Sequence, residues 1–309
     1  MPRKRTRQVS NKELRQHLAG LILSLREGDR LPSTRDLAAL YGTSVGSISN
    51  ALESLEAAGA VGIETRGRLG AFLRDRSVGL LWTAAADSPM VLGLTLASNP
   101  RYEGMATALK QGLRRAGIEA YLVFIRGSRT RLAALREGRC HAVVMSCFAA
   151  DELCGQGESI LFRLPVGSFA SGNAVFYWKG RTEAQGPLRV AIDRDSYDQT
   201  RMTELEFSGR EVELRPTILP QMLRLLSMGQ VDAAVVTADD MQAHLKEGIL
   251  EAPLSPSVRL FLDERDTSAA IVIRSSDRDV RGSLQAAINV DEMMGIQQAV
   301  VDGRRVAEY

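Results

Sequence analysis

Two groups of polar residues in this chain have the types and the spacing for specific recognition. The first lies in the stretch SVGSISN at 44–50, where short hydroxyl and amide side chains can approach base edges in a DNA groove. The second follows several apolar runs after residue 90, where hydroxyl, amide and guanidinium groups can hold a small ligand. We therefore expect double-stranded DNA and a small-molecule effector as partners.

The second group lies where the strands of a sheet are expected to end. In open parallel sheets, ligands bind beyond the carboxyl ends of the strands. Several of these residues also begin helices, whose free amides attract carboxylate or phosphate, so we expect an anionic effector with Arg126 as its anchor. Plain helix capping is the competing interpretation of each hydroxyl. The candidate effector-binding residues are Ser98, Asn99, Tyr102, Arg126, Ser128, Ser146, Asp193, Ser196, Gln199, Thr200 and Thr237.

The strands that precede these residues occur in two similar passes. The first pass predicts strands at 90–97, 120–125 and 141–146, with helices at 102–116 and 128–138. The second predicts strands at 188–192, 212–216 and 232–237, with helices at 197–207 and 219–228. At an offset of 91 residues, LREGRCHAVVMS at 135–146 matches LSMGQVDAAVVT at 226–237. Strands that alternate with helices indicate α/β lobes with parallel sheets covered on both faces.

The first group lies on a predicted helix that follows a tight turn. Ser33 is placed to cap a helix at 34–41, and Gly42 supplies the left-handed position that ends it. In the next helix, at 44–58, Ile48, Leu52 and Leu55 form one apolar stripe. A hairpin of strands at 60–65 and 69–74 then follows, so the order predicts a winged helix-turn-helix. Ser10 and Glu13 resemble a capping box that begins an earlier helix.

These residues resemble the winged helix-turn-helix of the GntR family. The similarity rests on LPSTRDLA at 31–38, GTS at 42–44, ALESLEAAG at 51–59 and the glycine-bearing hairpin. The resemblance implies that Arg35 reads DNA, whereas the two recognition-helix arginines of the family are Val45 and Ser49 here. Val45 either contacts a thymine methyl or packs on the preceding helix, and Ser49 either reads a base or touches a phosphate. The candidate DNA-binding residues are Arg35, Ser44, Val45, Ser47, Ser49, Asn50, Arg66, Gly67 and Arg68.

The basic charge of the chain is concentrated in its first part. Residues 1–76 hold 13 Lys and Arg against 8 Asp and Glu, whereas the other 233 residues hold 26 against 29. This distribution favours a DNA-binding N-terminal domain. The basic residues at 3–7 either follow phosphates or form a free tail. No cleavage site follows the apolar run at 18–25, and no run reaches the roughly 20 residues of a membrane span, so we expect a cytoplasmic protein.

The chain is predicted to consist of a DNA-binding domain at 1–76 and an effector domain at 77–309. The two-lobed pattern resembles the type 2 periplasmic-binding-protein fold, and its pairing with a GntR-like reader resembles the YhfZ-type regulators. The residues that carry this likeness are YEGMATALK at 102–110, Arg126-Gly127, the pattern D-x-x-S-x-D-Q at 193–199 and GQVDAAV at 229–235. It implies one lobe at about 88–165 with 274–309, and another at about 175–260. The implied chain crossings are 162–177 and 258–273, with a closing helix at 279–290 that returns to the first lobe.

The segment between the predicted domains and the cysteines give further expectations. SVGLLWTAAAD at 77–87 is predicted to be a linker helix that packs on the second domain or on a partner subunit through Leu80, Leu81 and Trp82. Cys140, Cys147 and Cys154 match neither a metal knuckle nor a disulfide framework, so we expect no metal site and no cofactor. Cys154, in a polar stretch, is the candidate for a reactive thiol.

The chain is not expected to be an enzyme. His17, His141 and His244 are scattered, and the sequence has no G-x-S-x-G, P-loop or H-E-x-x-H motif. Asp239 and Asp240 open a helix, where the helix dipole favours carboxylates. We predict a homodimeric transcriptional regulator whose operator affinity changes when the effector closes the cleft. Two alternatives stay open: an architectural DNA-binding protein with a ligandless dimerisation domain, and an enzyme on the same scaffold.

Overall fold

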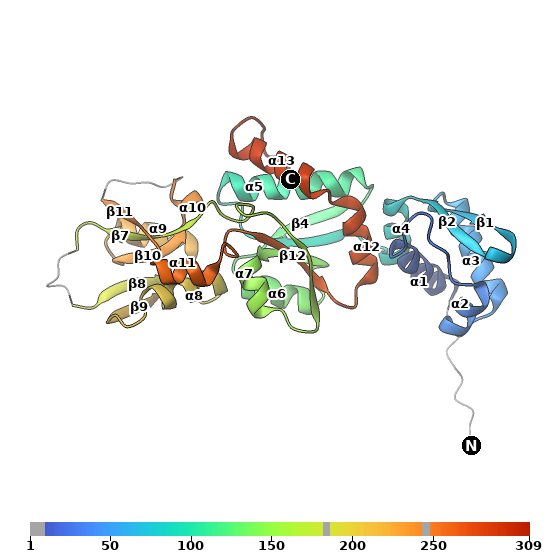
Figure 1. Cartoon of the computed structure of the whole chain (residues 1–309), viewed down its shortest axis with the longest axis horizontal. Coiled ribbons are helices and arrows are strands. Elements are labelled where there is room, and N and C mark those ends of the chain that lie inside the picture. Colours follow the sequence, from blue (N-terminus) through green and yellow to red (C-terminus); the bar gives the residue numbers. More distant parts are fainter. Residues whose placement is uncertain (1–9, 182–185, 243–247) are drawn as a thin grey trace, which may run out of the picture. The chain divides into compact units, whose positions relative to one another are not determined.

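The computed structural model of the protein describes residues 10–181, 186–242 and 248–309. Its elements group into two compact units, and each unit is considered by itself (Figure 1). Unit 1 contains residues 10–90, 111–121 and 276–289, and unit 2 contains the described part of 91–110, 122–275 and 290–309. The basic stretch at 3–7 and His244 lie outside the described residues.

Unit 1 contains the predicted winged helix-turn-helix. Its elements are α1 (Asn11–Leu23), α2 (Thr34–Tyr41), α3 (Val45–Ala57), β1 (Val61–Thr65), β2 (Ala71–Arg76), α4 (Val78–Ala86) and α12 (Arg278–Ala287). Ser10, Ser33 and Ser44 begin the first three helices, because each hydroxyl accepts a hydrogen bond from an amide of the first turn. Gly42 has a φ of 63° and ends α2. The predicted capping box and turn are therefore confirmed.

Two details of unit 1 differ from the prediction. The second strand of the hairpin begins at Ala71 rather than at residue 69, because a 3-10 turn at Gly67–Leu69 lengthens the connection and Gly70 closes it with a φ of 97°. In α3 the fully buried stripe is Ile48, Ala51 and Leu55, whereas Leu52 is half-buried. The face of α3 that packs against α1 and α2 is thus centred on Ala51.

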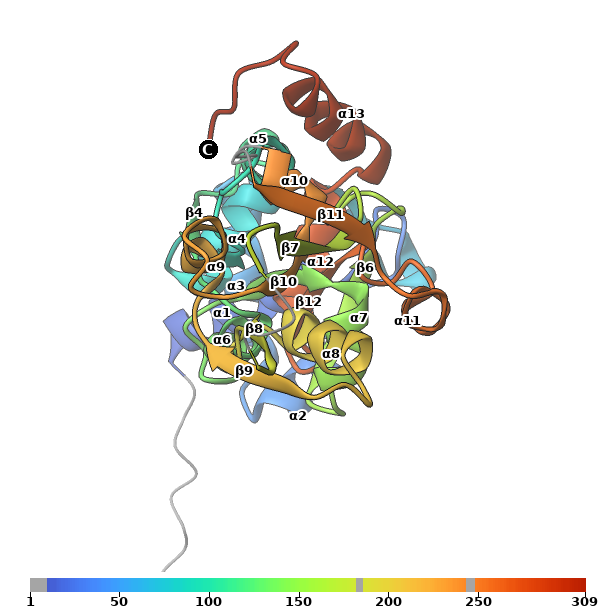
Figure 2. The same ribbon diagram turned by 90° about the vertical axis from the view of Figure 1, so that its left-hand side faces the viewer.

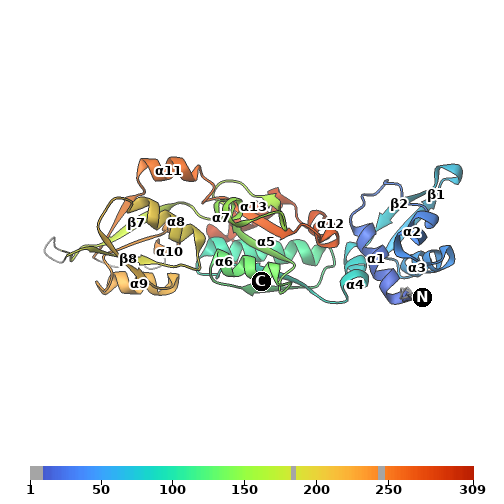
Figure 3. The same ribbon diagram turned by 90° about the horizontal axis from the view of Figure 1, so that it is seen from below.

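The predicted linker at 77–87 forms helix α4, which packs against α1 and α12 (Figure 3). Leu81 and Trp82 are buried, whereas Leu80 is exposed. The contact between α12 and α1 is close because α12 has a glycine there. A Cβ atom on Gly282 would lie 2.5 Å from the carbonyl carbon of Leu23. Helix α12 is therefore an integral part of unit 1, although it was expected to return to the first lobe.

Two five-stranded sheets organise the α/β part of the chain. The first has the order β4-β3-β5-β12-β6 and the second has the order β11-β7-β10-β8-β9. Figure 2 shows the strands of the second sheet from β11 at the top to β9 at the bottom. The first sheet contains β3 (Met90–Leu94), β4 (Ala120–Phe124), β5 (Ala142–Ser146), β6 (Glu158–Arg163) and β12 (Ala269–Arg274). The second contains β7 (Asn173–Trp178), β8 (Leu188–Ile192), β9 (Val212–Pro216), β10 (Ala233–Thr237) and β11 (Ile249–Pro253). Every strand of the two predicted passes is present, and β5 and β10 begin and end 91 residues apart.

The sheets are mixed, so the prediction of parallel sheets was only partly correct. The strands β3 and β5 are parallel, as are β8, β9 and β10. By contrast, β12 runs antiparallel to β5 and β6, and β7 runs antiparallel to β10 and β11. Both β7 and β12 follow a crossing from the other sheet. They are not reached through a helix on the same sheet, so the parallel direction that a βαβ unit imposes does not apply to them.

Strand β10 shows why an unbroken apolar run is a reliable strand signal here. Ala233 and Val235 belong to one buried cluster, which includes Met202 of α8. Ala234 and Val236 belong to another, which includes Met222 of α9. Successive side chains of a strand point to opposite faces, so helices on both faces bury every residue of the run.

The helices around the sheets are α5 (Pro100–Arg115), α6 (Ser128–Arg136), α7 (Cys147–Leu153), α8 (Tyr197–Glu206), α9 (Leu219–Ser227), α10 (Ala238–Gln242), α11 (Pro256–Leu262) and α13 (Val290–Val301). Of these, the sequence pattern did not predict α7, α11 and α13. The chain crosses between the sheets at 164–172 and 263–268. Both crossings are shorter than predicted, because β6, β7, α11 and β12 occupy the ends of the predicted segments.

Candidate functional site

Helix α3 presents a face of short polar side chains. Ser44 and Asn50 are exposed, and Ser47 and Ser49 are half-buried. The Ser44 hydroxyl already accepts the Ser47 amide at 3.0 Å, so it serves first as a helix cap. Val45 is 44% exposed, which shows that it does not pack fully against the preceding helix. Its isopropyl group is accessible for an apolar contact such as a thymine methyl.

The arginines near this face differ in how they are held. Arg66 donates to Glu64 at 2.8 Å and lies 4.6 Å over the ring of Phe72. The Glu64 hydrogen bond raises the pKa of Arg66. Arg35 and Arg68 are exposed and, among the described residues, pair with no carboxylate. Of the predicted arginines, these two have guanidinium groups available for phosphates, and Gly67 lies beside Arg68 at the exposed hairpin turn.

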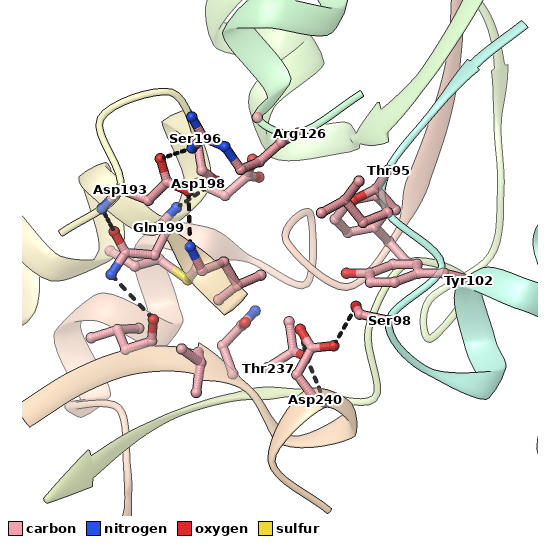
Figure 4. Close-up of a pocket in the computed structure, with 18 of the residues that line it drawn as sticks. Thr95, Ser98, Tyr102, Arg126, Asp193, Ser196, Asp198, Gln199, Thr237 and Asp240 are labelled. Atoms are coloured by element: carbon pink, nitrogen blue, oxygen red, sulfur yellow. Dashed lines mark hydrogen bonds and ion pairs between the residues drawn. The ribbon is translucent and has the colours of Figure 1, made fainter. Parts of the chain in front are cut away.

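Unit 2 contains a cavity of about 170 Å³ lined by residues that follow strands of both sheets (Figure 4). Apolar walls come from Leu96, Phe169, Leu223 and Val236. The polar ends of the two lobes converge here, as the strand-end argument predicted. The predicted effector residues that line the cavity are Ser98, Tyr102, Arg126, Asp193, Ser196, Gln199 and Thr237.

Arg126 lines the cavity, but its charge is already paired. Its guanidinium donates to Asp193 at 2.6 Å and also to Asp195. Asp193 is only 2% exposed, and its hydrogen bond raises the pKa of Arg126. The next residue, Gly127, has a φ of 77°, and a Cβ atom there would lie 2.5 Å from the Asp195 carbonyl oxygen. Arg126 therefore links the two lobes in this conformation, and it is not free to anchor an anion.

Asp198 in the first turn of α8 forms a second link between the lobes. Its carboxylate accepts hydrogen bonds from Ser128, at 3.2 Å, and from Ser146. Burial raises the pKa of Asp198, and the hydrogen bond from Ser146 opposes that rise. Ser128 also accepts the Tyr197 amide at 2.9 Å. These two serines were predicted to bind the effector directly, but the structure places them behind Asp198 and outside the cavity lining.

Asp240 in α10 forms the third link. It accepts hydrogen bonds from Ser98 at 2.7 Å (Figure 4) and from Asn99 at 2.8 Å, and both residues follow β3. Thr237 donates to its other oxygen at 3.1 Å. Asn99 is buried outside the cavity lining. From the sequence, Asp240 was interpreted only as an acid favoured by the helix dipole, so it was not predicted to line the cavity.

The remaining predicted residues support the loop after β8. The Thr200 hydroxyl donates to the Asp193 carbonyl at 2.8 Å and does not line the cavity. Gln199 accepts the Asp193 amide at 2.7 Å, and Ser196 caps α8. Hydroxyl capping, the competing interpretation, therefore describes Ser196 as well as Ser146, which caps α7.

Sequence reasoning missed two polar residues of the cavity that have unsatisfied atoms. Arg131 on α6 is 3% exposed, and its Nε atom has no hydrogen-bond partner. Among the described contacts, its side chain makes a single hydrogen bond, which it donates to the Ile125 carbonyl at 2.8 Å. Asn173 at the start of β7 donates to Asp266 at 2.6 Å, but its Oδ1 atom has no partner. Arg131 could have been predicted from its position three residues after Ser128, because residues one helical turn apart share a face of the helix.

The cysteines and histidines have structural surroundings. Burial raises the pKa of the Cys154 thiol to about 11, so the structure does not support the reactive thiol expected there. His141 accepts the Val91 amide at 2.9 Å, and His17 stacks on Tyr41. Within the described ranges, no group of three or more His, Cys, Asp or Glu side chains could hold a metal ion. None of the described helices has the length and apolar character to cross a membrane.

Comparison with known proteins identifies the family. Residues 78–309 match the family described as the YhfZ C-terminal domain. The chain belongs to the YhfZ family. Residues 26–73 match a family described as a helix-turn-helix domain. An Escherichia coli K12 member, described as uncharacterized protein YhfZ, is 30% identical over 295 residues, which are 94% of this chain and 95% of that protein.

A solved structure of a YhfZ protein agrees with this assignment. The crystal structure of YhfZ from Shigella flexneri is 27% identical, with a TM-score of 0.57 over 72% of this chain and 93% of that chain. An ABC-transporter periplasmic substrate-binding protein from Coxiella burnetii is 15% identical, with a TM-score of 0.45 over 69% of this chain and 98% of that one. The predicted YhfZ-type resemblance is confirmed, while the GntR subtype of the reader stays a prediction.

Proposed function

We propose that this protein is a transcriptional regulator whose operator affinity is controlled by a small effector in the unit 2 cavity. Helix α3 enters a major groove with Val45, Ser49 and Asn50 toward the bases, and Arg35 and Arg68 neutralise phosphates. The reader is of the GntR type and acts as a homodimer on a two-fold operator in the cytoplasm. The helix-turn-helix match supports the DNA-binding half of this proposal.

The observation that carries the effector half is the convergence of both lobes on one cavity. Asp193, Asp198 and Asp240 come from the second lobe, and each accepts hydrogen bonds from first-lobe residues beside the cavity. A ligand that competes for these groups or adds to them changes the free energy of lobe closure. Only such a difference in affinity between two conformations can transmit a signal.

Helix α12 offers a route by which lobe closure reaches the reader. The residues matched by the YhfZ C-terminal domain include α4, 111–121 and α12, yet these segments pack in unit 1 with α1. The DNA-binding helices therefore share a compact body with segments of the effector domain. A movement of these segments is therefore a movement of the body that contains the reader.

The experiment that tests this function measures DNA binding and ligand binding on the full chain. Selection from random duplexes should give a two-fold symmetric sequence, and its affinity should fall steeply with salt concentration. A compound that raises the melting temperature of the protein should also shift this affinity. A ligand that stabilises the protein without changing DNA affinity would contradict effector control, and absence of any duplex binding would contradict the function as a whole.

A further inference from the structure

The charged side chains of the cavity are unequally satisfied. Four carboxylates and two guanidinium groups line it: Asp193, Asp198, Asp240, Asp266, Arg126 and Arg131. Arg126 and Asp193 pair with each other, which removes one charge of each sign. The remaining groups are one guanidinium and three carboxylates, and none of them forms a direct ion pair within the part of the chain that the structure describes, although Arg131 and Asp198 attract each other electrostatically. Buried polar atoms without a partner are costly, so the Arg131 Nε and Asn173 Oδ1 atoms, which have none among the described residues, point to groups on a ligand.

Arg131 marks a subsite for an anionic group. It is buried, and its Nε–H donor has no partner. Burial lowers the pKa of its guanidinium to about 10, which still leaves it protonated at neutral pH. The planar guanidinium group binds carboxylates through paired hydrogen bonds. Because Arg126 is occupied by Asp193 and Asp195, Arg131 is the cavity arginine available to a carboxylate.

A subsite for a cationic group lies at the ends of β7 and β10. Asn173 and Thr237 are paired across these strands, and Thr237 donates to Asp240. Asn173 donates its amide N–H to Asp266, so its unpartnered Oδ1 atom remains as an acceptor. Among the described residues, Asp240 accepts hydrogen bonds from neutral side chains alone, and the Asp266 carboxylate accepts one from the Asn173 amide. An ammonium group supplies both the missing donors and the missing positive charge.

Tyr102 lines the same cavity as the two subsites. Its side chain points into the cavity beside Ser98 and Asp240 (Figure 4). Burial raises the pKa of Tyr102 well above its usual value, the Asp240 carboxylate adds to the rise, and the Arg131 guanidinium opposes it. Both charged groups thus act on one phenol. Arg131, Tyr102 and Asp240 all line this one cavity, so a single small molecule in it can meet both subsites.

We propose that the effector is a small zwitterion of the amino-acid type, with its carboxylate on Arg131 and its ammonium group at Asn173, Asp240 and Asp266. This inference rests on the proposed effector-controlled function and replaces the anionic effector expected from the sequence. The cavity of about 170 Å³ limits the ligand to a compact molecule. An engineered protein cavity of roughly 150 Å³ holds benzene, which sets the scale.

The first part of the test is a ligand panel on the full-length protein. Individual L-amino acids are screened by thermal unfolding, and each hit is compared with its α-amide, which lacks the carboxylate, and with its α-hydroxy acid, which lacks the ammonium group. Dicarboxylates, sugar phosphates and polyamines are included. At least one amino acid should raise the melting temperature. Its amide and hydroxy-acid analogues should bind about 10- to 150-fold more weakly, as expected for the loss of one charge-assisted interaction.

The second part uses variants of the two subsites. Arg131→Met should abolish the preference for the carboxylate over the amide, and Asp240→Asn should abolish the preference for the ammonium group over the hydroxyl. Asn173→Ala removes the unpartnered acceptor and leaves Asp240 intact, so it tests the same subsite if Asp240→Asn unfolds. Arg139→Met and Asp291→Asn, at exposed positions away from the cavity, are the matched controls and should leave binding unchanged.

The outcomes separate this inference from the proposed function. Stabilisation by a different class in the panel, accompanied by a change in DNA affinity, would overturn the zwitterion and leave effector control standing. Equal binding of an amino acid and its hydroxy acid would overturn the ammonium subsite. Stabilisation by no compound of the panel would overturn the zwitterion, and the duplex-binding measurement would then judge the DNA-binding function separately.

Discussion

Replacing Gly282 by alanine tests whether α12 is firmly joined to the DNA-binding helices. The new Cβ atom would lie 2.5 Å from the Leu23 carbonyl carbon, closer still to its oxygen, and 3.1 Å from the Ser24 nitrogen. All three neighbours are backbone atoms of the end of α1, so no side-chain rotation can relieve the overlap. The Arg76 guanidinium donates to the carbonyl groups of Ile22 and Leu23 at 3.1 and 2.9 Å and holds this end of α1 in place.

The expected cost of Gly282→Ala follows from two opposing effects. Overpacking a tight contact costs about 1–3 kcal/mol, whereas alanine is favoured over glycine in a helix by up to ~1 kcal/mol. Because backbone must move, we expect a net loss of about 1–2 kcal/mol in the free energy of unfolding. This corresponds to a melting temperature lower by roughly 3–8 °C. The assay is thermal unfolding of the full chain, followed by its affinity for a selected duplex.

The control is Gly295→Ala, at an exposed position in the middle of α13 where a Cβ atom would have no neighbour within 4 Å. It makes the same chemical change in a helix of unit 2 and should raise stability by up to ~1 kcal/mol. The two variants should therefore shift the melting temperature in opposite directions. If Gly282→Ala were as stable as Gly295→Ala, the close contact between α12 and α1, and the route that depends on it, would be refuted.

Three further predictions follow from the site. Replacing Arg126 by alanine should weaken lobe closure by about 1.5–3 kcal/mol, because it leaves the buried Asp193 without its cation. Small-angle scattering of the full chain should then show a larger radius of gyration. An unchanged radius would argue against the link between Arg126 and Asp193. Replacing Arg35 or Arg68 by alanine should lower DNA affinity and reduce the magnitude of the slope of log K against log salt by about 0.9 for each arginine. The control is Arg215→Ala, because the exposed Arg215 side chain already pairs with a glutamate. It should change neither this slope nor the radius of gyration. Because burial raises the pKa of the Cys154 thiol to about 11, its alkylation should be slow at pH 8 and about tenfold faster with each pH unit up to 11. An alkylation rate that levels off near pH 8 would contradict this burial.

The local rules of the sequence predicted much of the fold because local forces decide those elements. Ser33 and Gly42 begin and end α2 through hydrogen bonds within a few residues. The run at 232–237 predicted β10 because both faces of this strand are covered. Gly138 and Gly229 correspond at the offset of 91, and both have positive φ, 74° and 67°, so the internal repeat reflects a shared backbone conformation.

The sequence failed where distant parts of the chain decide the structure. Strands β7 and β12 run antiparallel because of the crossings that precede them, which no local pattern reveals. The cavity residues show the same limit. Strand ends predicted the region in which the cavity lies. Asp240 was interpreted as an ordinary first-turn acid, and nothing nearby in sequence shows that first-lobe hydroxyl and amide groups bind Asp198 and Asp240. The pairing of Arg126 with Asp193 likewise joins residues 67 positions apart.

The most direct test of the account is the affinity of the full-length protein for its selected duplex, measured across a salt series with and without the stabilising amino acid. We expect a steep fall of affinity with salt and a change of about 5- to 150-fold when the amino acid is added, which corresponds to ~1–3 kcal/mol of coupling. We also expect this change to vanish in Arg131→Met and to persist in the control variant Arg139→Met. No affinity for any duplex, or an affinity that saturating ligand leaves unchanged, would contradict the central claim that occupancy of the cavity governs DNA binding.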